Sequence, residues 1–563
     1  MRLSPVLAVL LVAVCAGAPA ASLSVRAAPG TPIGARFLFD FGDGTYAWSN
    51  ATIARPDASN ASWNATRDAA TQAGVAVAWG WSPSFGIYIV GLGSAPGLVG
   101  LYLWNRTTTE WDELLVGISS LVLRDGDVLA ISQVGFDPVT YAPLYPVPTP
   151  LSPYPVQEFR GDLANTGASA SRAPGSLAVR WDRDLHLREI ASSPAVAFGR
   201  VYILTMDGLF AINEATGGVA WSNPSIRGLS TPAVFNGTLL LGGSDGRLHA
   251  VDASSGADLW NVTLVEHPQF SGITSSPKLW LGTAYVGTFN ETGGPGEVVA
   301  LWATNGTIRW RHTAFGSVSF SSPALSNGFL LVGVIGRYNT TTQVTYDPPY
   351  GLLSLDATTG SPRWFYRTNA SVAASPLVTG SEVVVPAKNG FVYALNATTM
   401  ALLWKANVAA GVSSPALVGS RIVVGGGSLG TGGRVTALDL ATGSVVWSFI
   451  PNGPVQTSVA AADGKVFFAT NVANGTVYAL NGSTGGLLWS YTPSPAQYIF
   501  GSPVVADGYL LAPSDNGHLY AFQEAAPVAP SGLPWVPITF AVLVVVVALV
   551  LTLWIVRRRR HAP

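Results

Sequence analysis

Residues 437–447 read Ala437-Leu438-Asp439-Leu440-Ala441-Thr442-Gly443-Ser444-Val445-Val446-Trp447, and variants of this phrase return along most of the chain. Each copy opens with Ser-Ser-Pro or a close variant, and two short apolar runs separated by a Gly-containing turn follow. One complete copy runs from Ser230 through the Asp245-Gly246 turn to Trp260. A phrase that returns at such an interval indicates a repeat architecture.

The openings and the closing tryptophans set the size and the number of the repeats. Eight openings begin at Ser192, Ser230, Ser275, Ser321, Ala374, Ser413, Thr457 and Gly501. Seven closing tryptophans follow at Trp221, Trp260, Trp310, Trp364, Trp404, Trp447 and Trp489, at intervals of 39 to 54 residues. Such an interval is the length of a four-stranded β-propeller blade. The eighth copy stops at Phe522 without a tryptophan.

The missing strand of the eighth copy is expected at the other end of the repeat region. Leu177-Ala178-Val179-Arg180-Trp181 precedes the first opening by the interval that separates a closing strand from the next opening. Pairing of this strand with the last copy would close the ring and remove its exposed sheet edges. An open array with frayed ends is the alternative.

The repeat phrase resembles the PQQ-like, quinoprotein-type and BamB-like propeller repeat, and Phe159-Arg160-Gly161-Asp162-Leu163-Ala164-Asn165-Thr166-Gly167 resembles the lead-in to such propellers. The resemblance covers about Gln157 to Phe522 and implies a propeller domain over 157–523. It also implies that the tryptophans dock between neighbouring blades, so that Trp404→Ala should cost about 3–5 kcal/mol. The tryptophans expected in this structural role are Trp181, Trp221, Trp260, Trp310, Trp364, Trp404, Trp447 and Trp489.

The same resemblance raises the question of catalysis. Dehydrogenases of this type hold pyrroloquinoline quinone (PQQ) with calcium or a lanthanide ion, and many carry a vicinal Cys pair. Here the single cysteine, Cys15, lies in the leader described below, and Asp252, Asp356 and Asp439 occupy turn positions. His186, His249, His267, His312 and His518 show no metal-ligand spacing. We therefore expect no catalytic residue, no metal and no cofactor. A PQQ-dependent oxidoreductase is the alternative, and only it would bind PQQ with calcium.

Residues 22–153 lack the repeat and are expected to form a separate small domain. Arg36 to Phe41 alternates like a strand, Asn64 to Ala73 is a candidate helix, and Leu-x-Asp-Gly-Asp at 123–127 leads into a last strand. This order resembles the transcobalamin C-terminal-like β domain of β-grasp type. The Phe-Gly-Asp-Gly phrase at 41–44 alone also resembles a polycystic-kidney-disease-type sandwich, which has no such helix. The first resemblance implies a second alternative function, the capture of a small ligand such as a corrinoid.

Both ends of the chain indicate export and anchoring. Residues 1–20 resemble a signal peptide with a small-residue cleavage site at Ala18-Pro19-Ala20, although an uncleaved anchor is the alternative. Residues 535–556 are almost uncharged and long enough to span a bilayer, and Arg557 to Arg560 follow immediately. The positive-inside rule then places 557–563 in the cytosol and the body outside, joined through a linker at 524–534.

Asn-x-Ser/Thr sequons are more frequent than expected by chance. At this Ser and Thr content, chance would produce about four of them. They either carry glycans or reflect the shared preference of Asn, Thr and Gly for turns. They stand at Asn50, Asn60, Asn64, Asn105, Asn236, Asn261, Asn290, Asn305, Asn339, Asn369, Asn396, Asn474 and Asn481.

The chain is therefore predicted to be mainly β, with an eight-bladed β-propeller, a small N-terminal α+β (β-grasp-like) domain and one C-terminal transmembrane helix. A formal net charge of -1 without a long charge run argues against nucleic acid as a partner. The expected function is that of a glycosylated, membrane-anchored cell-surface protein. It would bind or scaffold envelope or extracellular proteins through its propeller without chemistry of its own.

Overall fold

The computed structural model describes residues 33–526, apart from 42–45, 57, 85, 94, 97–98, 106–109, 115, 125, 134–146, 148, 151–154, 187–191, 267 and 269–271. The predicted signal peptide, most of the linker, the predicted transmembrane helix and the cytosolic tail lie outside the described residues, as do Cys15 and His267. No helix in the described part is long and apolar enough to cross a membrane. The main boundary between two compact units falls near residue 153.

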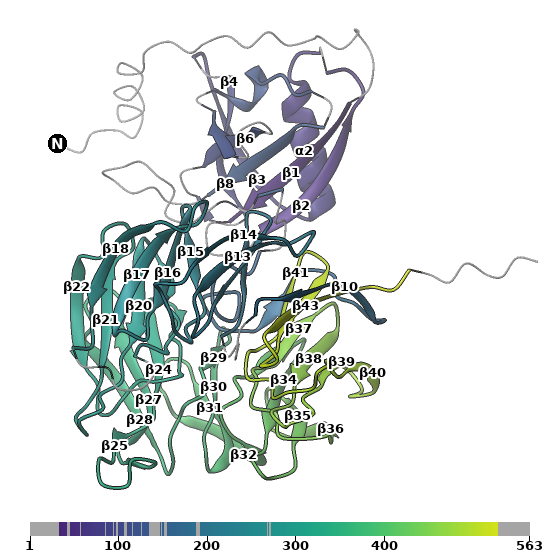
Figure 1. Ribbon diagram of the computed structural model, residues 1–563. Coiled ribbons are helices and arrows are strands. Elements are labelled where there is room, and N and C mark those ends of the chain that lie inside the picture. Colours follow the sequence, from purple (N-terminus) through teal and green to yellow (C-terminus); the bar gives the residue numbers. More distant parts are fainter. Residues whose placement is uncertain are drawn as a thin grey trace, which may run out of the picture. The chain divides into compact units, whose positions relative to one another are not determined.

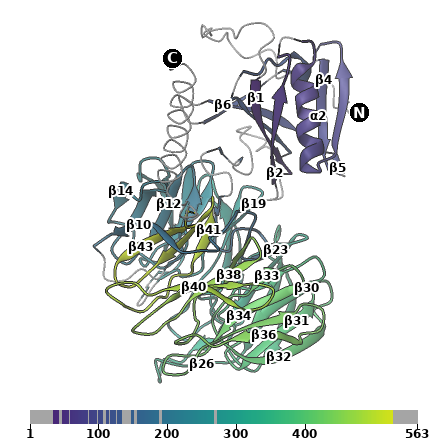
Figure 2. The ribbon, with the colours of Figure 1, turned by 90° about the vertical axis from the view of Figure 1, so that its right-hand side faces the viewer.

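The N-terminal unit is built on one mixed five-stranded sheet with the order β2-β1-β8-β6-β7. Helix α2 (Ala61–Ala73) lies against this sheet in Figures 1 and 2, and its Trp63, Ala69 and Ala70 pack on Phe37 and Phe39. The sheet strands are β1 (Ile33–Asp40), β2 (Tyr46–Ile53), β6 (Gly100–Asn105), β7 (Glu110–Glu113) and β8 (Val128–Ser132). A second sheet contains β3 (Val77–Ser82), β4 (Gly86–Leu92) and β5 (Ala95–Pro96), and a 3-10 turn η1 covers Ile118–Ser120.

The second unit repeats one simple motif, a four-stranded antiparallel meander that we call a blade. Blade 1 has β11 (Ala195–Ala197), β12 (Arg200–Leu204), β13 (Leu209–Asn213) and β14 (Val219–Asn223). Blade 2 has β15 (Ala233–Phe235), β16 (Thr238–Gly242), β17 (Arg247–Asp252) and β18 (Asp258–Thr263). Blade 3 has β19 (Lys278–Trp280), β20 (Thr283–Gly287), β21 (Glu297–Trp302) and β22 (Ile308–Thr313). Blade 4 has β23 (Ala324–Ser326), β24 (Phe329–Val334), β27 (Tyr350–Asp356) and β28 (Pro362–Thr368).

The remaining meanders continue the series. Blade 5 has β29 (Leu377–Val378), β30 (Glu382–Pro386), β31 (Gly390–Asn396) and β32 (Leu402–Ala410). Blade 6 has β33 (Ala416–Val418), β34 (Arg421–Gly426), β35 (Arg434–Asp439) and β36 (Val445–Phe449). Blade 7 has β37 (Ala460–Ala462), β38 (Lys465–Ala469), β39 (Val477–Asn481) and β40 (Leu487–Tyr491). Blade 8 has β41 (Val504–Ala506), β42 (Tyr509–Pro513), β43 (His518–Gln523) and β10 (Ala178–Asp184). One short hairpin, β25 (Arg337–Tyr338) and β26 (Tyr346–Asp347), extends from blade 4.

Blade 8 takes its outer strand from the start of the repeat region. Strand β10 pairs antiparallel with β43, and Trp181 lies opposite Ala521. The same small-residue-to-tryptophan pairing occurs inside other blades, for example between Ala437 and Trp447. Two segments far apart in the sequence therefore complete one sheet, in the way that the position of Trp181 predicts.

Buried apolar strands form the core of each blade. In β12, Val201, Tyr202, Ile203 and Leu204 are all at most 1 % exposed, because the strand is covered on both faces. The hairpin turns contain glycines with positive φ, as at Gly246 (φ +77°), where the backbone conformation disfavours a side chain.

Candidate functional site

Seven of the eight closing tryptophans link their blade to the next. The indole Nε1 of Trp447 donates a 3.0 Å hydrogen bond to the Gly482 carbonyl of blade 7, and its ring lies where a Cβ on Gly485 would come within 2.6 Å. The equivalent bonds run from Trp181 to Glu214, Trp221 to Ala253, Trp260 to Thr304, Trp310 to Ala357, Trp404 to Leu440 and Trp489 to Pro174. The glycine of the turn in the next blade, as at Gly256, Gly443 and Gly485, thus provides the space that the preceding tryptophan fills.

Trp364 departs from this pattern. Its side chain is 46 % exposed, and its indole makes no such hydrogen bond within the described residues. The residue that should make room for it is Met400, which adopts φ +56° where the other blades have glycine. Opposite Trp364 lies Ser354, in place of the usual alanine, and its buried hydroxyl has no partner. The contact between blades 4 and 5 therefore lacks the docked, hydrogen-bonded tryptophan that the other blades have.

The Ser-Ser-Pro openings form a ring of hydrogen bonds, a role that the sequence did not reveal. The backbone N–H of the second opening residue donates to the hydroxyl of the corresponding residue in the next blade. Seven such bonds of 2.8–3.3 Å join Thr231, Ser276, Ser322, Ser375, Ser414, Ser458, Ser502 and Ser193 in that order. The bond from Ser502 to Ser193 joins the last blade to the first.

Replacement of one ring hydroxyl tests this arrangement. Ser414 is 3 % exposed and accepts a 3.0 Å bond from the Ser375 N–H, so Ser414→Ala leaves a buried donor unpaired. We expect the free energy of unfolding to fall by about 1–3 kcal/mol, measured by chemical denaturation. Ser381→Ala, at an exposed serine, is the matched control and should change little. Equal stability of the two variants would contradict a role for the ring.

Residues 156–169, which we call the lead-in segment, run along the inner strands of the blades. Carbonyls of this segment accept N–H bonds from Leu325, Val378, Leu417 and Ala461, each in an inner strand of blades 4 to 7. Val156 pairs with Val196 of blade 1, and β9 (Ala168–Ser169) pairs in parallel with β37. The side-chain amide of the buried Asn165 donates to the carbonyls of Ser322, Pro323 and Pro376. The lead-in segment therefore occupies the space enclosed by the inner strands.

Two buried cations hold the lead-in segment in place. Lys278, fully buried at the start of blade 3, donates to Glu158 Oε1 at 3.1 Å, the Phe159 carbonyl at 3.0 Å and the Asp162 carbonyl at 2.7 Å. Arg160, 8 % exposed, donates to the Pro415 carbonyl of blade 6. Burial lowers the pKa of the Arg160 guanidinium to about 10, while nearby Asp162 acts in the opposite direction. The guanidinium therefore stays charged at neutral pH.

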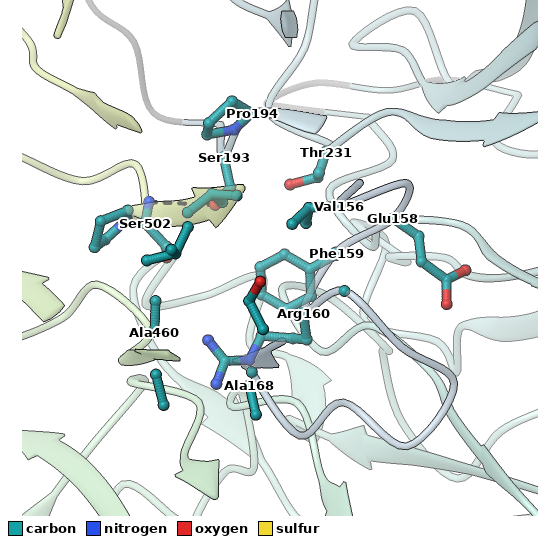
Figure 3. A pocket seen from close by; sticks show the side chains of 17 residues that line it. Val156, Glu158, Phe159, Arg160, Ala168, Ser193, Pro194, Thr231, Ala460 and Ser502 are labelled. Carbon is teal, nitrogen blue, oxygen red and sulfur yellow. Dashed lines mark hydrogen bonds between the residues drawn. The ribbon is translucent and has the colours of Figure 1, made fainter. Parts of the chain in front are cut away.

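A small cavity of about 30 Å³ lies beside Arg160 (Figure 3). Its walls come from the lead-in segment, from the openings of blades 1, 2 and 8 and from strand β37 of blade 7, with Ser193, Thr231 and Ser502 contributing side chains. Ligand pockets for drug-sized molecules measure about 300–1,000 Å³. The one carboxylate in the wall, Glu158, is engaged by Lys278. The residues here do not fit a tricyclic quinone with a calcium ion.

Several of the acidic residues and histidines singled out in the sequence are held by hydrogen bonds or ion pairs. Asp252, Asp356 and Asp439 accept bonds from backbone N–H groups two or three residues further on, and the hydroxyls of Ser254 and Ser255 hold the pKa of Asp252 below its usual range. His249 contacts Asp245 at 3.0 Å, and His518 contacts Asp182 at 2.6 Å. Within the described part of the chain, no three His, Cys, Asp or Glu side chains gather as a metal site would require.

The sequons differ in how their asparagines are presented. Those at Asn50, Asn60, Asn64, Asn236, Asn261, Asn305, Asn369 and Asn474 are exposed, and those at Asn105, Asn290, Asn339, Asn396 and Asn481 are half-buried. Asn290 donates its side-chain amide to the Pro295 carbonyl, and Asn396 and Asn481 accept N–H bonds within their turns. Some of these asparagines therefore have a role in a turn, and others lie exposed on the surface.

The N-terminal unit has a groove of its own, of about 940 Å³. It is lined by β1, β2 and α2, and its walls include Arg36, Asn50, Asp68 and Gln72. The Arg36 guanidinium lies 4.2 Å from the centre of the Trp48 ring. Polar and apolar surface contribute about equally to its lining, whereas typical small-molecule pockets are mostly apolar.

The blades, their tryptophan links and the lead-in segment define a propeller of PQQ-like repeats. The family model described as "Outer membrane protein assembly factor BamB" matches residues 165–331, 294–449 and 431–526, so the chain belongs to this family.

Curated relatives fall into two functional groups. The alcohol dehydrogenase (quinone) dehydrogenase subunit of Gluconacetobacter polyoxogenes is 26 % identical over 250 residues, covering 38 % of this chain and 34 % of the relative. Outer membrane protein assembly factor BamB of Moranella endobia is 24 % identical over 278 residues, covering 47 % and 65 %. The chain thus spans about a third of the first relative and under two thirds of the second.

Solved structures agree on the fold. Quinohemoprotein alcohol dehydrogenase from Comamonas testosteroni aligns with a TM-score of 0.57 at 16 % identity, over 68 % of this chain and 82 % of that one. A europium-containing methanol dehydrogenase aligns with a TM-score of 0.54 at 14 % identity, over 66 % and 98 %. At these identities the likeness concerns the fold alone.

Proposed function

We propose that this protein is a membrane-anchored, extracytoplasmic binding or scaffold protein that acts through a closed eight-bladed propeller and performs no chemistry of its own. The observation that carries the proposal is the lead-in segment, which is hydrogen-bonded to the inner strands and leaves a cavity of only about 30 Å³ beside Arg160. A quinone-dependent dehydrogenase needs a substrate-accessible site for its cofactor. We take the BamB relatives, named as outer membrane protein assembly factors, as the functional analogue.

One face of the propeller is suited to bind a protein partner. In an antiparallel meander, the loops between the second and third strands lie on the same face as the connectors that lead into the next inner strand. We call this the connector face. Its loops and connectors carry exposed apolar side chains at Met206, Phe315, Phe320, Leu429, Ile450, Tyr498 and Phe500. Exposed apolar side chains gathered on one face mark interaction sites. The proposed partner is an envelope or extracellular protein with a complementary apolar surface.

Cross-linking of the full-length protein in its native membrane tests this proposal. The double variant Phe320→Asn/Phe500→Asn removes two aromatic side chains that are 53 % and 39 % exposed. We expect it to lose most of the cross-linked partner seen with the wild-type protein by mass spectrometry. Trp302→Ser is the control, because Trp302 is 37 % exposed but lies next to a turn on the opposite face. Equal capture by both variants would contradict the connector face as the binding surface.

Reconstitution with PQQ and calcium separates the proposal from its main alternative. We expect the full-length protein to retain no stoichiometric quinone after desalting, as measured by absorbance, and to show no dye-linked alcohol oxidation. The physical reason is the small volume left beside the lead-in segment. Stoichiometric uptake together with alcohol oxidation would establish the quinoprotein oxidoreductase instead.

The proposed anchoring, glycosylation and surface location rest on the sequence. Residues 535–556 have the length and apolar character of a membrane span, and the arginines at 557–560 orient it. The eight exposed sequon asparagines could carry glycans without disturbing the buried strands.

A further inference from the structure

The outer edge of the contact between blades 4 and 5 is built differently from the rest of the ring. In six blades, a Cβ on the turn glycine would lie only 2.4–2.7 Å from the docked tryptophan ring, as at Gly443 beside Trp404. Met400 stands at this position in blade 5 and does carry a Cβ. It keeps the left-handed φ of +56° and the same backbone bond, from its N–H to the Asn396 carbonyl. The turn is therefore preserved, while the docking space for Trp364 is filled.

Two features weaken the packing at this outer edge. Ser354 is 1 % exposed and lies opposite Trp364, and its hydroxyl has no partner within the described residues. The other seven blades pair an alanine with their tryptophan. A buried hydroxyl without a hydrogen bond raises the free energy of the packed state, and so does a non-glycine residue such as Met400 at positive φ. The outer edge therefore gains less from closing than the equivalent edges do.

The inner edge of the same contact is held closed. The Ser322 N–H donates a 2.8 Å bond to the Ser375 hydroxyl, which belongs to the ring of opening residues. The side-chain amide of Asn165 donates to Pro323 of blade 4 at 3.1 Å and to Pro376 of blade 5 at 3.2 Å. The lead-in segment also accepts one N–H bond from an inner strand of each of the two blades. The two blades are therefore joined near the centre of the ring and less firmly at its outer edge.

Blades 5 and 6 are joined more firmly than blades 4 and 5. The indole of Trp404 donates a 2.7 Å bond to the Leu440 carbonyl of blade 6. The long outer strand β32 also reaches the next blade, where Ala410 pairs with Gly426, so that the two blades form one continuous sheet. Movement between neighbouring blades is therefore easier on the blade 4 side of blade 5 than on its blade 6 side.

We infer that the propeller has a hinge between blades 4 and 5. The outer strands β28 and β32 separate reversibly in the native protein, while the bonds of the inner edge keep the ring closed. Opening exposes the Ser354 hydroxyl to water and breaks no tryptophan link, and local openings of this kind occur where few stabilising contacts hold a region. The hinge lets a closed ring flex without release of the lead-in segment. It does not depend on the proposed binding function, so either can fail alone.

Thiol labelling of the full-length protein measures this opening, because Cys15 is the only cysteine of the chain. Ser354→Cys places a thiol in the contact. Thr436→Cys is the matched control, since Thr436 is also 1 % exposed and lies in the corresponding third strand of blade 6. We expect labelling roughly ten-fold faster or more at 354 than at 436 under native conditions, because local opening needs less free energy than global unfolding. Peptide mapping by mass spectrometry separates both from Cys15. Equal rates at the two positions would overturn the hinge.

Restoration of the repeat pattern gives a second, independent readout. Met400→Gly/Ser354→Ala supplies the turn glycine and the small residue that docked tryptophans contact elsewhere, so that Trp364 can dock. We expect a higher melting temperature and slower backbone hydrogen exchange in β28 and β32 than in the wild-type protein, although truncation of a buried methionine normally destabilises. Addition of Trp364→Ala should abolish both gains. A lower melting temperature of the double variant, or exchange no slower than in the wild-type protein, would contradict the inference.

Discussion

Trp447→Ala is expected to lower the free energy of unfolding by about 3–5 kcal/mol, whereas Trp364→Ala should lower it by about 1 kcal/mol or less. Trp447 is 8 % exposed, its indole is hydrogen-bonded to Gly482, and its ring fills the space above Gly485. Its removal leaves a cavity between blades 6 and 7. Trp364 holds the same position in its repeat but is 46 % exposed and lacks this hydrogen bond.

The pair of variants forms its own control, because both remove the same side chain from the same strand position of two blades. Chemical denaturation followed by circular dichroism measures the difference. Similar losses for the two variants would contradict the view that docking, rather than the tryptophan itself, provides the stability. A large loss for Trp364→Ala alone would mean that the contact between blades 4 and 5 is stabilised in a way that the hydrogen bonds and exposures do not reveal.

Lys278→Met is expected to lower the free energy of unfolding by about 3–5 kcal/mol, because it removes the ammonium group that pairs with the buried Glu158 carboxylate. Lys278 is fully buried, and it donates hydrogen bonds to Glu158, Phe159 and Asp162 of the lead-in segment. The loss should therefore include release of the lead-in segment, detected as faster backbone hydrogen exchange over 156–169. Lys405→Met, at an exposed lysine of blade 5, is the control and should change stability little.

A double variant separates the charge from the packing. In Lys278→Met/Glu158→Gln no buried charge is left unpaired, so the double variant should be more stable than the sum of the two single losses predicts. Additive losses would show that the two side chains contribute independently, and would contradict their assignment as one ion pair.

The repeat region is the part of the fold that could be predicted best. The four-stranded unit and the closing strand at Trp181 follow from the spacing of tryptophans and openings, because every repeat has the same local structure and therefore a similar residue pattern. Helix α2 begins three residues before the predicted Asn64, since Asn60 adopts a left-handed conformation ahead of it. The span over 121–124 has strand-like residues, but it connects η1 to the turn before β8.

The candidate site was harder to predict, because its partners are far apart in the sequence. The Lys278–Glu158 pair spans 120 residues, and the Arg160–Pro415 pair spans 255. No local sequence pattern predicts such distant pairs. The Ser-Ser-Pro openings were visible, but their hydrogen bonds join neighbouring blades rather than neighbouring residues. The exception at Trp364 did leave a signal, since Thr399-Met400 replaces the Thr-Gly pair of the next repeat. That substitution could have been read as the loss of the docking space.

The pairing of β10 with β43 has a consequence for how the protein is made. Arg180 and Gln523 lie 343 residues apart, yet their side chains are hydrogen-bonded across one sheet. During synthesis, strand β10 stays unpaired until its partner strand β43 has been made. Contacts of such long separation form slowly, so the ring closes in a late step that couples the two ends of the domain. A chain that stops before β43 would leave β10 with an open edge, and incomplete molecules would thereby be distinguishable from complete ones.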